Sequence, residues 1–216
     1  MDPSTPAQTA SRPLGDAERH LMRVCPAMRR HVPNHEPFPE KFERFKDPYK
    51  ALIRAVVYQQ LSGKAAGTIY ARVMALYGRR HPTPEDILDT PVERLRGAGL
   101  SRQKIAAIRD IAMRRLDRVI PQQRSIARLD DEAIIERLTE VRGVGRWTVE
   151  MYLIFSLGRP DVLPVDDLGV RKGAEKLVGR PLTPQELGEY GARWAPWRSA
   201  AAWHCWRATE TVLMTS

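Results

Sequence analysis

The sequence predicts an all-α protein. No segment shows a sustained alternation of apolar and polar residues, which would indicate half-buried strands. Apolar residues instead recur at helical spacing along most of the chain, and prolines, glycines and capping residues divide them into helices joined by short loops. With 216 residues, the chain can form one or two small domains with a buried core.

The first half of the chain contains three helical segments. Residues 48–77 predict two buried helices separated by a polar break at Gln59-Gln60-Leu61. Thr83 and Pro84 are typical of the N-cap and first turn of a further helix. An apolar stripe over residues 105–112 predicts an amphipathic helix with a basic surface. Its flanking basic residues are Arg102, Lys104, Arg109, Arg114 and Arg115, and we interpret these arginines as a solvated face.

The second half is also helical. Asp130 is the expected cap of a short helix, and a glycine-containing turn follows it. Residues 147–157 are apolar nearly all round apart from Glu150, which predicts a helix buried in the core. A last helical segment is expected over residues 187–213. It carries the tryptophans Trp194, Trp197, Trp203 and Trp206.

The composition limits the classes of function. Cys25 and Cys205 lie far apart and the five histidines are scattered, so neither a disulfide framework nor a zinc or iron–sulfur site is expected. No apolar run is long enough to span a membrane, and residues 1–15 predict a disordered tail without the apolar core of a secretory signal. We therefore expect a cytoplasmic protein, nucleoid-associated if bacterial. The net charge of +9 fits a polyanionic partner, but equally a basic protein without one.

The most informative stretch is the turn that contains Gly143 and Gly145. Glycines permit positive φ and leave the backbone open to an incoming group. The N–H groups at the start of the following helix can then hold a phosphate, with Arg146 adding positive charge beside it. Ordinary helix–helix turns also use glycine. The flanking helices, the basic residues and Thr148 after the turn make phosphate binding the stronger interpretation.

This turn and its helices resemble the helix-hairpin-helix of DNA-repair glycosylases, and the resemblance covers roughly residues 47–207. The chain is most similar to bacterial 3-methyladenine DNA glycosylase II and its shorter fungal-type relatives. The four motifs that carry the resemblance are Arg54–Ser62 with Ala65-Ala66, Gly143–Thr148, Leu163–Gly169, and Trp194–Ser199 followed by His204-Cys205-Trp206.

The resemblance implies two helical subdomains with a cleft between them. Residues 16–46 and 160–216 are expected to form one subdomain from both ends of the chain. Residues 47–159 form the other, which carries the helix-hairpin-helix at about 133–157. Larger relatives have an additional N-terminal β-sheet domain, and this chain is expected to be a short form without it.

Asp166 and Asp167 precede a helix that starts near Leu168. From their position alone, both are expected only to cap that helix. The resemblance implies that Asp167 is catalytic and leaves the capping to Asp166. Breaking an N-glycosidic bond builds positive charge on the sugar, which a nearby carboxylate stabilises while it orients or deprotonates the attacking water.

Several further residues acquire roles from the resemblance. Glycosylases that also cut the DNA backbone have a Schiff-base lysine where this chain has Trp147, so a monofunctional enzyme is expected. Trp206 and Trp147 match pocket walls for a flipped base, where electron-rich rings attract cationic purines. Met151 stands where larger relatives have a pocket tyrosine, and Tyr152 is one place off. Of the other tryptophans, Trp194 and Trp203 are expected in the core, and Trp197 is left undecided.

The polar break and the hairpin complete the expected site. Gln59, Gln60 or Leu61 is expected to act as the wedge that fills the gap left by the flipped base, although a plain helix–helix turn is the alternative. No cofactor is expected for catalysis. The resemblance implies a structural Na⁺ or K⁺ held by the backbone carbonyls of Thr139, Val141 and Val144. Gly143, Val144, Gly145, Arg146 and Thr148 are the expected contacts with the DNA backbone.

The sequence therefore predicts a monofunctional glycosylase that releases alkylated purines, such as 3-methyladenine and 7-methylguanine, in base excision repair. Its expected partner is double-stranded DNA with damaged bases, on which it acts as a monomer without any membrane. A non-catalytic helix-hairpin-helix DNA-binding module, a glycosylase for another damaged base, and a bifunctional glycosylase/lyase are the alternatives.

Overall fold

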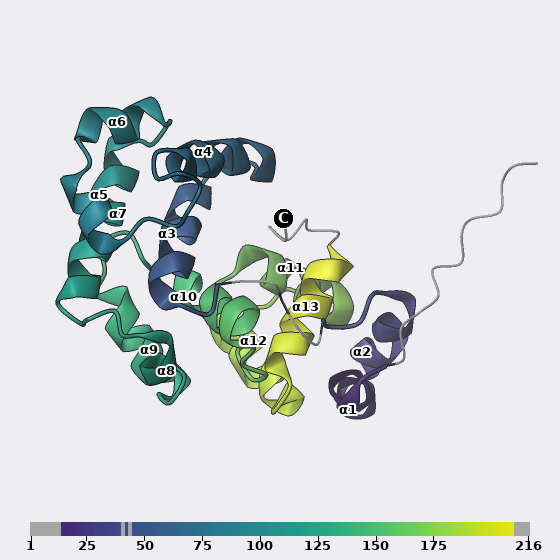
Figure 1. Cartoon of the computed structure of the whole chain (residues 1–216). Coiled ribbons are helices and arrows are strands. Elements are labelled where there is room, and N and C mark those ends of the chain that lie inside the picture. Colours follow the sequence, from purple (N-terminus) through teal and green to yellow (C-terminus); the bar gives the residue numbers. More distant parts are fainter. Residues whose placement is uncertain (1–13, 40–41, 43–44, 210–216) are drawn as a thin grey trace, which may run out of the picture. The chain divides into compact units, whose positions relative to one another are not determined.

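The computed structural model describes residues 14–39, 42 and 45–209. Helices make up all the regular structure over this range, as Figure 1 shows, and the prediction of an all-α fold is confirmed. The described residues form two compact units. Residues 14–39 and 160–209 make up unit 1, and residues 42 and 45–159 make up unit 2. None of the described helices is long and apolar enough to cross a membrane.

Unit 1 combines the two ends of the chain. Its helices are α1 (Asp16–Val24), α2 (Pro26–His31), α11 (Leu168–Val178), α12 (Pro184–Gly191) and α13 (Arg198–Ala208), with 3₁₀ turns η1 (Val32–Asn34) and η3 (Ala192–Trp194). Figure 1 shows α11 and α13 side by side, and these two helices form the most extensive contact of the unit. Trp194 and Trp203 are buried, which confirms their predicted place in the core.

Two predictions at the ends of the chain need correction. The single late helix expected over residues 187–213 is instead α12 and α13, separated by η3 and by the cis Ala195–Pro196 peptide, because proline cannot continue a helix. Residues 1–13 of the expected disordered tail lie outside the described residues. Gly15, also assigned to that tail, is the N-cap of α1 and donates its N–H to Glu18.

Unit 2 contains the eight helices from α3 to α10 and the π-helical turn η2 (Leu153–Leu157). The helices are α3 (Pro48–Tyr58), α4 (Gly63–Ala75), α5 (Pro84–Asp89), α6 (Val92–Gly97), α7 (Arg102–Leu116), α8 (Gln123–Ile126), α9 (Asp131–Thr139) and α10 (Arg146–Tyr152). Helix α3 is buried along most of its length. Helix α4 buries only Ala66, Val73 and Met74, so the prediction of two buried helices is right for α3 and wrong for α4.

The basic side of helix α7 contacts other parts of unit 2, which a solvated basic face would not do. Its apolar stripe of Ile105, Ile108 and Ile111 is buried as predicted. The interpretation of its arginines as a solvated face is wrong for Arg115, which forms an ion pair with Asp47 at 2.9 Å and donates to the carbonyl of Pro121. Asp47 lies 68 residues before Arg115 and Pro121 lies just beyond the end of α7, so the residues of the helix alone do not reveal these partners.

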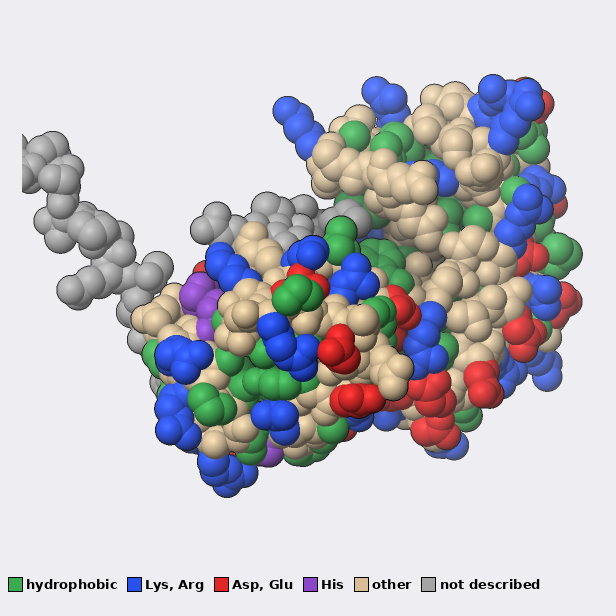
Figure 2. All heavy atoms as spheres, turned by 180° about the vertical axis from the view of Figure 1, so that it is seen from behind, with side chains coloured by type: hydrophobic (Ala, Val, Ile, Leu, Met, Phe, Trp, Pro, Cys, Tyr) green, Lys and Arg blue, Asp and Glu red, His purple; other side chains and the backbone are tan. Residues whose placement is uncertain are grey.

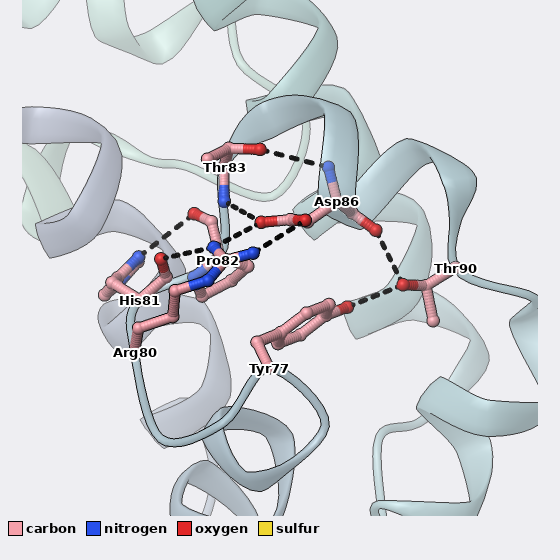
Figure 3. Close-up of polar contacts among 7 residues, drawn as sticks. All are labelled: Tyr77, Arg80, His81, Pro82, Thr83, Asp86 and Thr90. Carbon is pink, nitrogen blue, oxygen red and sulfur yellow. Dashed lines mark hydrogen bonds and ion pairs between the residues drawn. The ribbon is translucent and has the colours of Figure 1, made fainter.

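A polar cluster fixes the loop between α4 and α5 (Figure 3). Thr83 caps α5 as predicted, and its N–H donates to the Asp86 carboxylate at 2.7 Å. Arg80 donates to the same carboxylate, and this bond together with the Thr83 N–H holds the pKa of Asp86 well below its ordinary value. Thr90 connects the end of α5 to the Tyr77 hydroxyl at 2.9 Å. These contacts give the cluster a structural role in unit 2.

Three histidine rings meet where α2 packs against α13 in unit 1. His31 stacks on His35 with ring centroids 3.7 Å apart, and it lies edge-on to His204 at 5.8 Å. Burial, together with the positive charge that His35 and His204 can carry, lowers the pKa of His31 to about 4. The folded protein therefore holds His31 in its neutral form at neutral pH.

Acidification from pH 7 to pH 5 is expected to destabilise the protein through His31. The unfolded chain takes up a proton at His31 near pH 6.5, whereas the folded chain resists protonation down to about pH 4. The unfolded state therefore binds more protons in this window, so the stability is full above pH 6.5 and is lost as the pH falls toward 4. The melting temperature of the wild type should fall more steeply with pH than that of His31→Gln, with His20→Gln behaving as the wild type. Parallel profiles for the wild type and His31→Gln would contradict this account.

Candidate functional site

The hairpin between α9 and α10 is a tight turn with a buried inner side. Val144 donates its N–H to the carbonyl of Val141 at 3.0 Å, and both valine side chains are buried. Gly143 has a φ of +76°, which favours glycine. A Cβ built on Gly145 would meet no protein atom within 4 Å, so the outer side of the turn is open to an incoming group.

The residues expected to contact the DNA backbone divide into two groups. Gly143, Gly145 and Arg146 are exposed on the hairpin. Val144 and Thr148 are buried, and the N–H of Thr148 donates to the carbonyl of Gly145 at 2.9 Å. The exposed group lies at the start of α10, where the first N–H groups have no carbonyl one turn earlier to accept them.

Arg146 has a second role that the sequence did not reveal. Its guanidinium donates to both carboxylate oxygens of Glu132 on α9, at 2.6 and 3.1 Å, and to the buried Glu150 on α10 at 3.1 Å. The hydrogen bonds that Arg146 donates to Glu132 raise the pKa of Arg146, so its charge is firmly held. Arg146 therefore connects the two helices of the hairpin, α9 and α10. The carboxylates of Glu132 and Glu150 largely balance its positive charge.

The polar break at Gln59-Gln60-Leu61 forms the turn between α3 and α4. Gln60 is exposed and has a φ of +57°, which is uncommon for a residue with a side chain. Leu61 is half-buried. Gln59 points back to the protein, and its side-chain Nε2 donates to the carbonyl of Gly143 at 3.0 Å. The turn is therefore bonded directly to the hairpin within unit 2.

Asp167 lies at the start of α11, next to the buried indole of Trp206 on α13. The Asp167 Oδ1 atom accepts the N–H of Val170 at 2.8 Å and the Trp206 Nε1–H at 2.9 Å. Asp167 is thus the N-cap of α11, and the prediction that Asp166 would cap this helix is wrong. The capping bond and the indole together fix the orientation of the Asp167 carboxylate, while Asp166 is exposed.

Two glycines on α11 make this contact possible. A Cβ on Gly169 would lie 2.8 Å from Trp206 Cδ1 and 3.1 Å from the Asp167 Oδ1 atom. A Cβ on Gly173 would lie 1.8 Å from the carbonyl oxygen of Cys205, so only glycine lets the two helices approach this closely. The four-residue spacing of the glycines places them on one face of α11, and this spacing is a signal already present in the sequence.

The remaining residues expected in the base pocket lie on α10. The indole of Trp147 is 39 % exposed, which is unusual for so large an apolar group, and Met151 is half-buried one turn later. Tyr152 is buried, and its hydroxyl donates to the carbonyl of Lys46 at 2.8 Å. The Tyr152 hydroxyl is therefore used inside unit 2.

The charged side chains of the described residues bear on two kinds of binding site, a metal site and a basic surface. Among the described residues, no group of His, Cys, Asp and Glu side chains is arranged to hold a metal ion. On the face drawn in Figure 2, Lys and Arg side chains are scattered among Asp and Glu. Charge alone therefore does not locate a binding surface on this face, and the hairpin remains the candidate contact with a phosphate backbone.

Comparison with known proteins identifies the family of this chain. Residues 53–196 match the model of the HhH-GPD superfamily of base excision DNA repair proteins. The chain belongs to this superfamily. The resemblance to 3-methyladenine DNA glycosylases, inferred above from four motifs, is confirmed.

The named relatives of this HhH-GPD protein are DNA glycosylases. DNA-3-methyladenine glycosylase 1 of Schizosaccharomyces pombe is 42 % identical over 175 residues, covering 80 % of this chain and 77 % of the relative. The structure of a 3-methyladenine DNA glycosylase from the same organism, in complex with abasic DNA, matches with a TM-score of 0.82, 39 % identity, and coverage of 92 % and 98 %. A DNA-3-methyladenine glycosidase from Bacillus halodurans also matches, with a TM-score of 0.82, 31 % identity, and coverage of 91 % and 90 %.

Substitution of Gly173 by Ala should strongly destabilise this HhH-GPD protein. The new methyl group would overlap the Cys205 carbonyl, which belongs to a helix backbone and cannot move aside as a flexible side chain could. We expect a loss of about 3 kcal/mol in the free energy of unfolding, at the upper end for overpacked sites. Urea denaturation measures this loss.

Gly188→Ala is the matched control for that measurement. Gly188 is also in a helix, but its Cβ would meet only Val165, at an ordinary contact distance of 3.9 Å. Because alanine favours helices over glycine, this variant should gain about 0.5–1 kcal/mol. Equal stabilities of the two variants would refute the proposed close packing of α11 and α13.

Proposed function

We propose that this protein is a monofunctional DNA glycosylase that releases alkylated purines, such as 3-methyladenine and 7-methylguanine, from double-stranded DNA. The observation that carries the proposal is the Asp167 carboxylate, held at the end of α11 by the Val170 N–H and the Trp206 indole. The family and the names of its relatives support the same activity. We propose that the enzyme acts as a monomer, in the cytoplasm or nucleoid.

The oriented carboxylate fits the chemistry of N-glycosidic bond hydrolysis. As the bond to the base breaks, positive charge develops on the sugar, and an adjacent carboxylate stabilises it. Asp167 then orients or deprotonates the water that attacks the sugar carbon. Alkylated purines already carry positive charge and leave as neutral bases, so no strong acid is needed to protonate them.

The exposed Trp147 supports base release without strand cleavage. A lyase needs an amine that forms a Schiff base with the sugar, and an indole cannot do this. The product is therefore an abasic site in an intact strand. We propose that the Trp147 and Met151 side chains contact the extruded base, with the Trp147 indole favouring cationic purines through its electron-rich face. Trp206, whose indole is buried, serves the reaction through its Nε1–H bond to Asp167.

The hairpin and the α3–α4 turn supply the DNA contacts in this proposal. The open outer side of the hairpin at Gly145 suits a phosphate, which binds without reading sequence. The exposed Gln60 at the apex of its turn is a candidate wedge, together with Leu61. Such a residue fills the space that a flipped base leaves in the duplex.

Asp167→Asn should abolish most base release and leave the fold intact. Asparagine caps a helix as well as aspartate does, so the stability should stay within about 0.5 kcal/mol of the wild type. The loss of charge should lower the single-turnover rate of 3-methyladenine or 7-methylguanine release from methylated DNA by about 10²–10³-fold.

Asp166→Asn serves as the control, because it removes the neighbouring carboxylate, which is exposed. It should release bases at nearly the wild-type rate. Equal rates for wild type and Asp167→Asn would overturn the catalytic assignment. Salt-dependent DNA binding without any base release would favour a non-catalytic binding module, and a borohydride-trapped covalent complex would favour a lyase.

We also propose that the hairpin carbonyls of Thr139, Val141 and Val144 hold a monovalent cation. The fit is chemically sound, because the Val141 carbonyl accepts the Val144 N–H at 3.0 Å and a carbonyl oxygen has a second lone pair that can face a cation. Such an ion would stiffen the turn and add positive charge beside a bound phosphate.

Replacement of K⁺ by tetramethylammonium at constant ionic strength should therefore weaken binding of an abasic-site duplex. The large organic cation cannot enter the turn, whereas the general screening of phosphates is unchanged. Fluorescence anisotropy measures the Kd, and an expected weakening of about threefold or more corresponds to one lost phosphate contact. An identical Kd in both salts would contradict the cation proposal.

A further inference from the structure

Lys104 of unit 2 is hydrogen-bonded to the protein and does not extend freely into solvent. Its Nζ atom donates to the carbonyls of Val57 at 2.7 Å and Gln59 at 2.8 Å, at the end of α3. Partial burial of the ammonium group lowers the pKa of Lys104. The ammonium group thereby compensates the partial negative charge at the C-terminal end of α3. The Gln59–Leu61 turn begins at this end of the helix.

The same helix, α7, also supports the hairpin. Asp110 accepts the N–H of Arg142 at 2.8 Å. A Cβ on Gly143 would lie 3.1 Å from the Cβ of Ala107, so the hairpin packs closely on α7 at this point. Lys104, Ala107 and Asp110 follow one another at three-residue spacing, so they share one side of the helix. One side of α7 therefore contacts both the α3–α4 turn and the hairpin.

Gln59 connects the α3–α4 turn directly to the hairpin. Its backbone carbonyl accepts the Lys104 ammonium group, and its side-chain amide donates to the carbonyl of Gly143. The Gln59 side chain is thus directed into the protein, while the neighbouring Gln60 is exposed at a left-handed backbone conformation. The turn and the hairpin are held in a fixed position relative to each other by two side chains, Lys104 and Gln59.

We propose that Lys104 and Gln59 are positioning residues that fix the α3–α4 turn against the hairpin, so that a hairpin bound to the DNA backbone sets where the turn enters the duplex. The proposal rests on the proposed function, in which the hairpin binds phosphate and the exposed part of the turn is the wedge. It assigns Gln59 to the support of the wedge, and leaves insertion to Gln60 or Leu61.

The experiment compares Lys104→Met and Gln59→Glu with two controls. Arg102→Met removes a positive charge two residues away on the exposed surface of the same helix. Lys104→Arg retains a cation that can reach the carbonyls. Gln59→Glu is nearly isosteric but replaces the donor to the Gly143 carbonyl with an acceptor. Melting temperatures identify which variants are folded at the assay temperature.

Amide hydrogen exchange tests the support directly, without DNA. Lys104→Met and Gln59→Glu should speed exchange in the α3–α4 turn, and Gln59→Glu should also speed it in the hairpin, while Arg102→Met changes neither. Unchanged exchange in both folded variants would overturn the proposal.

Fluorescence of a duplex with an abasic-site analogue opposite 2-aminopurine tests the function of this support. Because small misplacements of positioned groups have large effects, the unstacking signal should fall by about tenfold in Lys104→Met and Gln59→Glu. The affinity for undamaged duplex should stay within about twofold, since the hairpin is retained. Lys104→Arg should recover most of the signal. An unstacking signal equal to that of Arg102→Met would overturn the positioning role.

A further variant, Gln60→Ala combined with Leu61→Ala, separates this proposal from the proposed function. If it leaves the unstacking signal intact, the wedge assignment is wrong. The hydrogen-exchange result then still decides whether Lys104 and Gln59 hold the turn against the hairpin.

Discussion

The close contact between α11 and α13 is the constraint on which the chemistry of unit 1 depends. Gly173 brings the α11 backbone against the Cys205 carbonyl, and Gly169 lets the indole of Trp206 lie beside the start of the same helix. Only at this separation can the Trp206 Nε1–H reach the Asp167 carboxylate. A side chain at either glycine would push the helices apart and remove the bond that orients the Asp167 carboxylate.

Asp167 serves the fold as the N-cap of α11, and in the proposed function it also serves the reaction. Its Oδ1 atom caps α11, which stabilises the helix, and the same bond restricts the rotation of the carboxylate. A catalytic group that is already oriented loses little freedom when the substrate binds, so more of the interaction energy is available to the transition state. In unit 2 the hairpin follows the same logic, because Arg146 and Gln59 hold its position through protein contacts.

The sequence predicted the helical class, the hairpin, the Thr83 and Asp130 caps and the buried Trp194 and Trp203, because each depends on local spacing or on side-chain size. It failed where the partner is distant in the chain. Lys104 and Arg115 look like members of a solvated stripe, and only folding brings them to carbonyls and to Asp47. The capping role was assigned to Asp166 because two adjacent acids offer no local signal for which one lies at the N-cap. The expected roles of Trp147, Met151 and the wedge residues, like the expected cleft, stay predictions.

The central claim is that Trp206 acts on the reaction through Asp167, and a double-mutant cycle on the single-turnover rate of 7-methylguanine release tests it most directly. Trp206→Phe keeps an aromatic ring but removes the Nε1–H. In the wild-type background it should lower the rate by about tenfold, the loss of one charge-assisted hydrogen bond. In the Asp167→Asn background it should lower the rate by less than about twofold, because the interaction it removes is no longer productive. Equal losses in both backgrounds would show that the two residues act independently and would contradict the account.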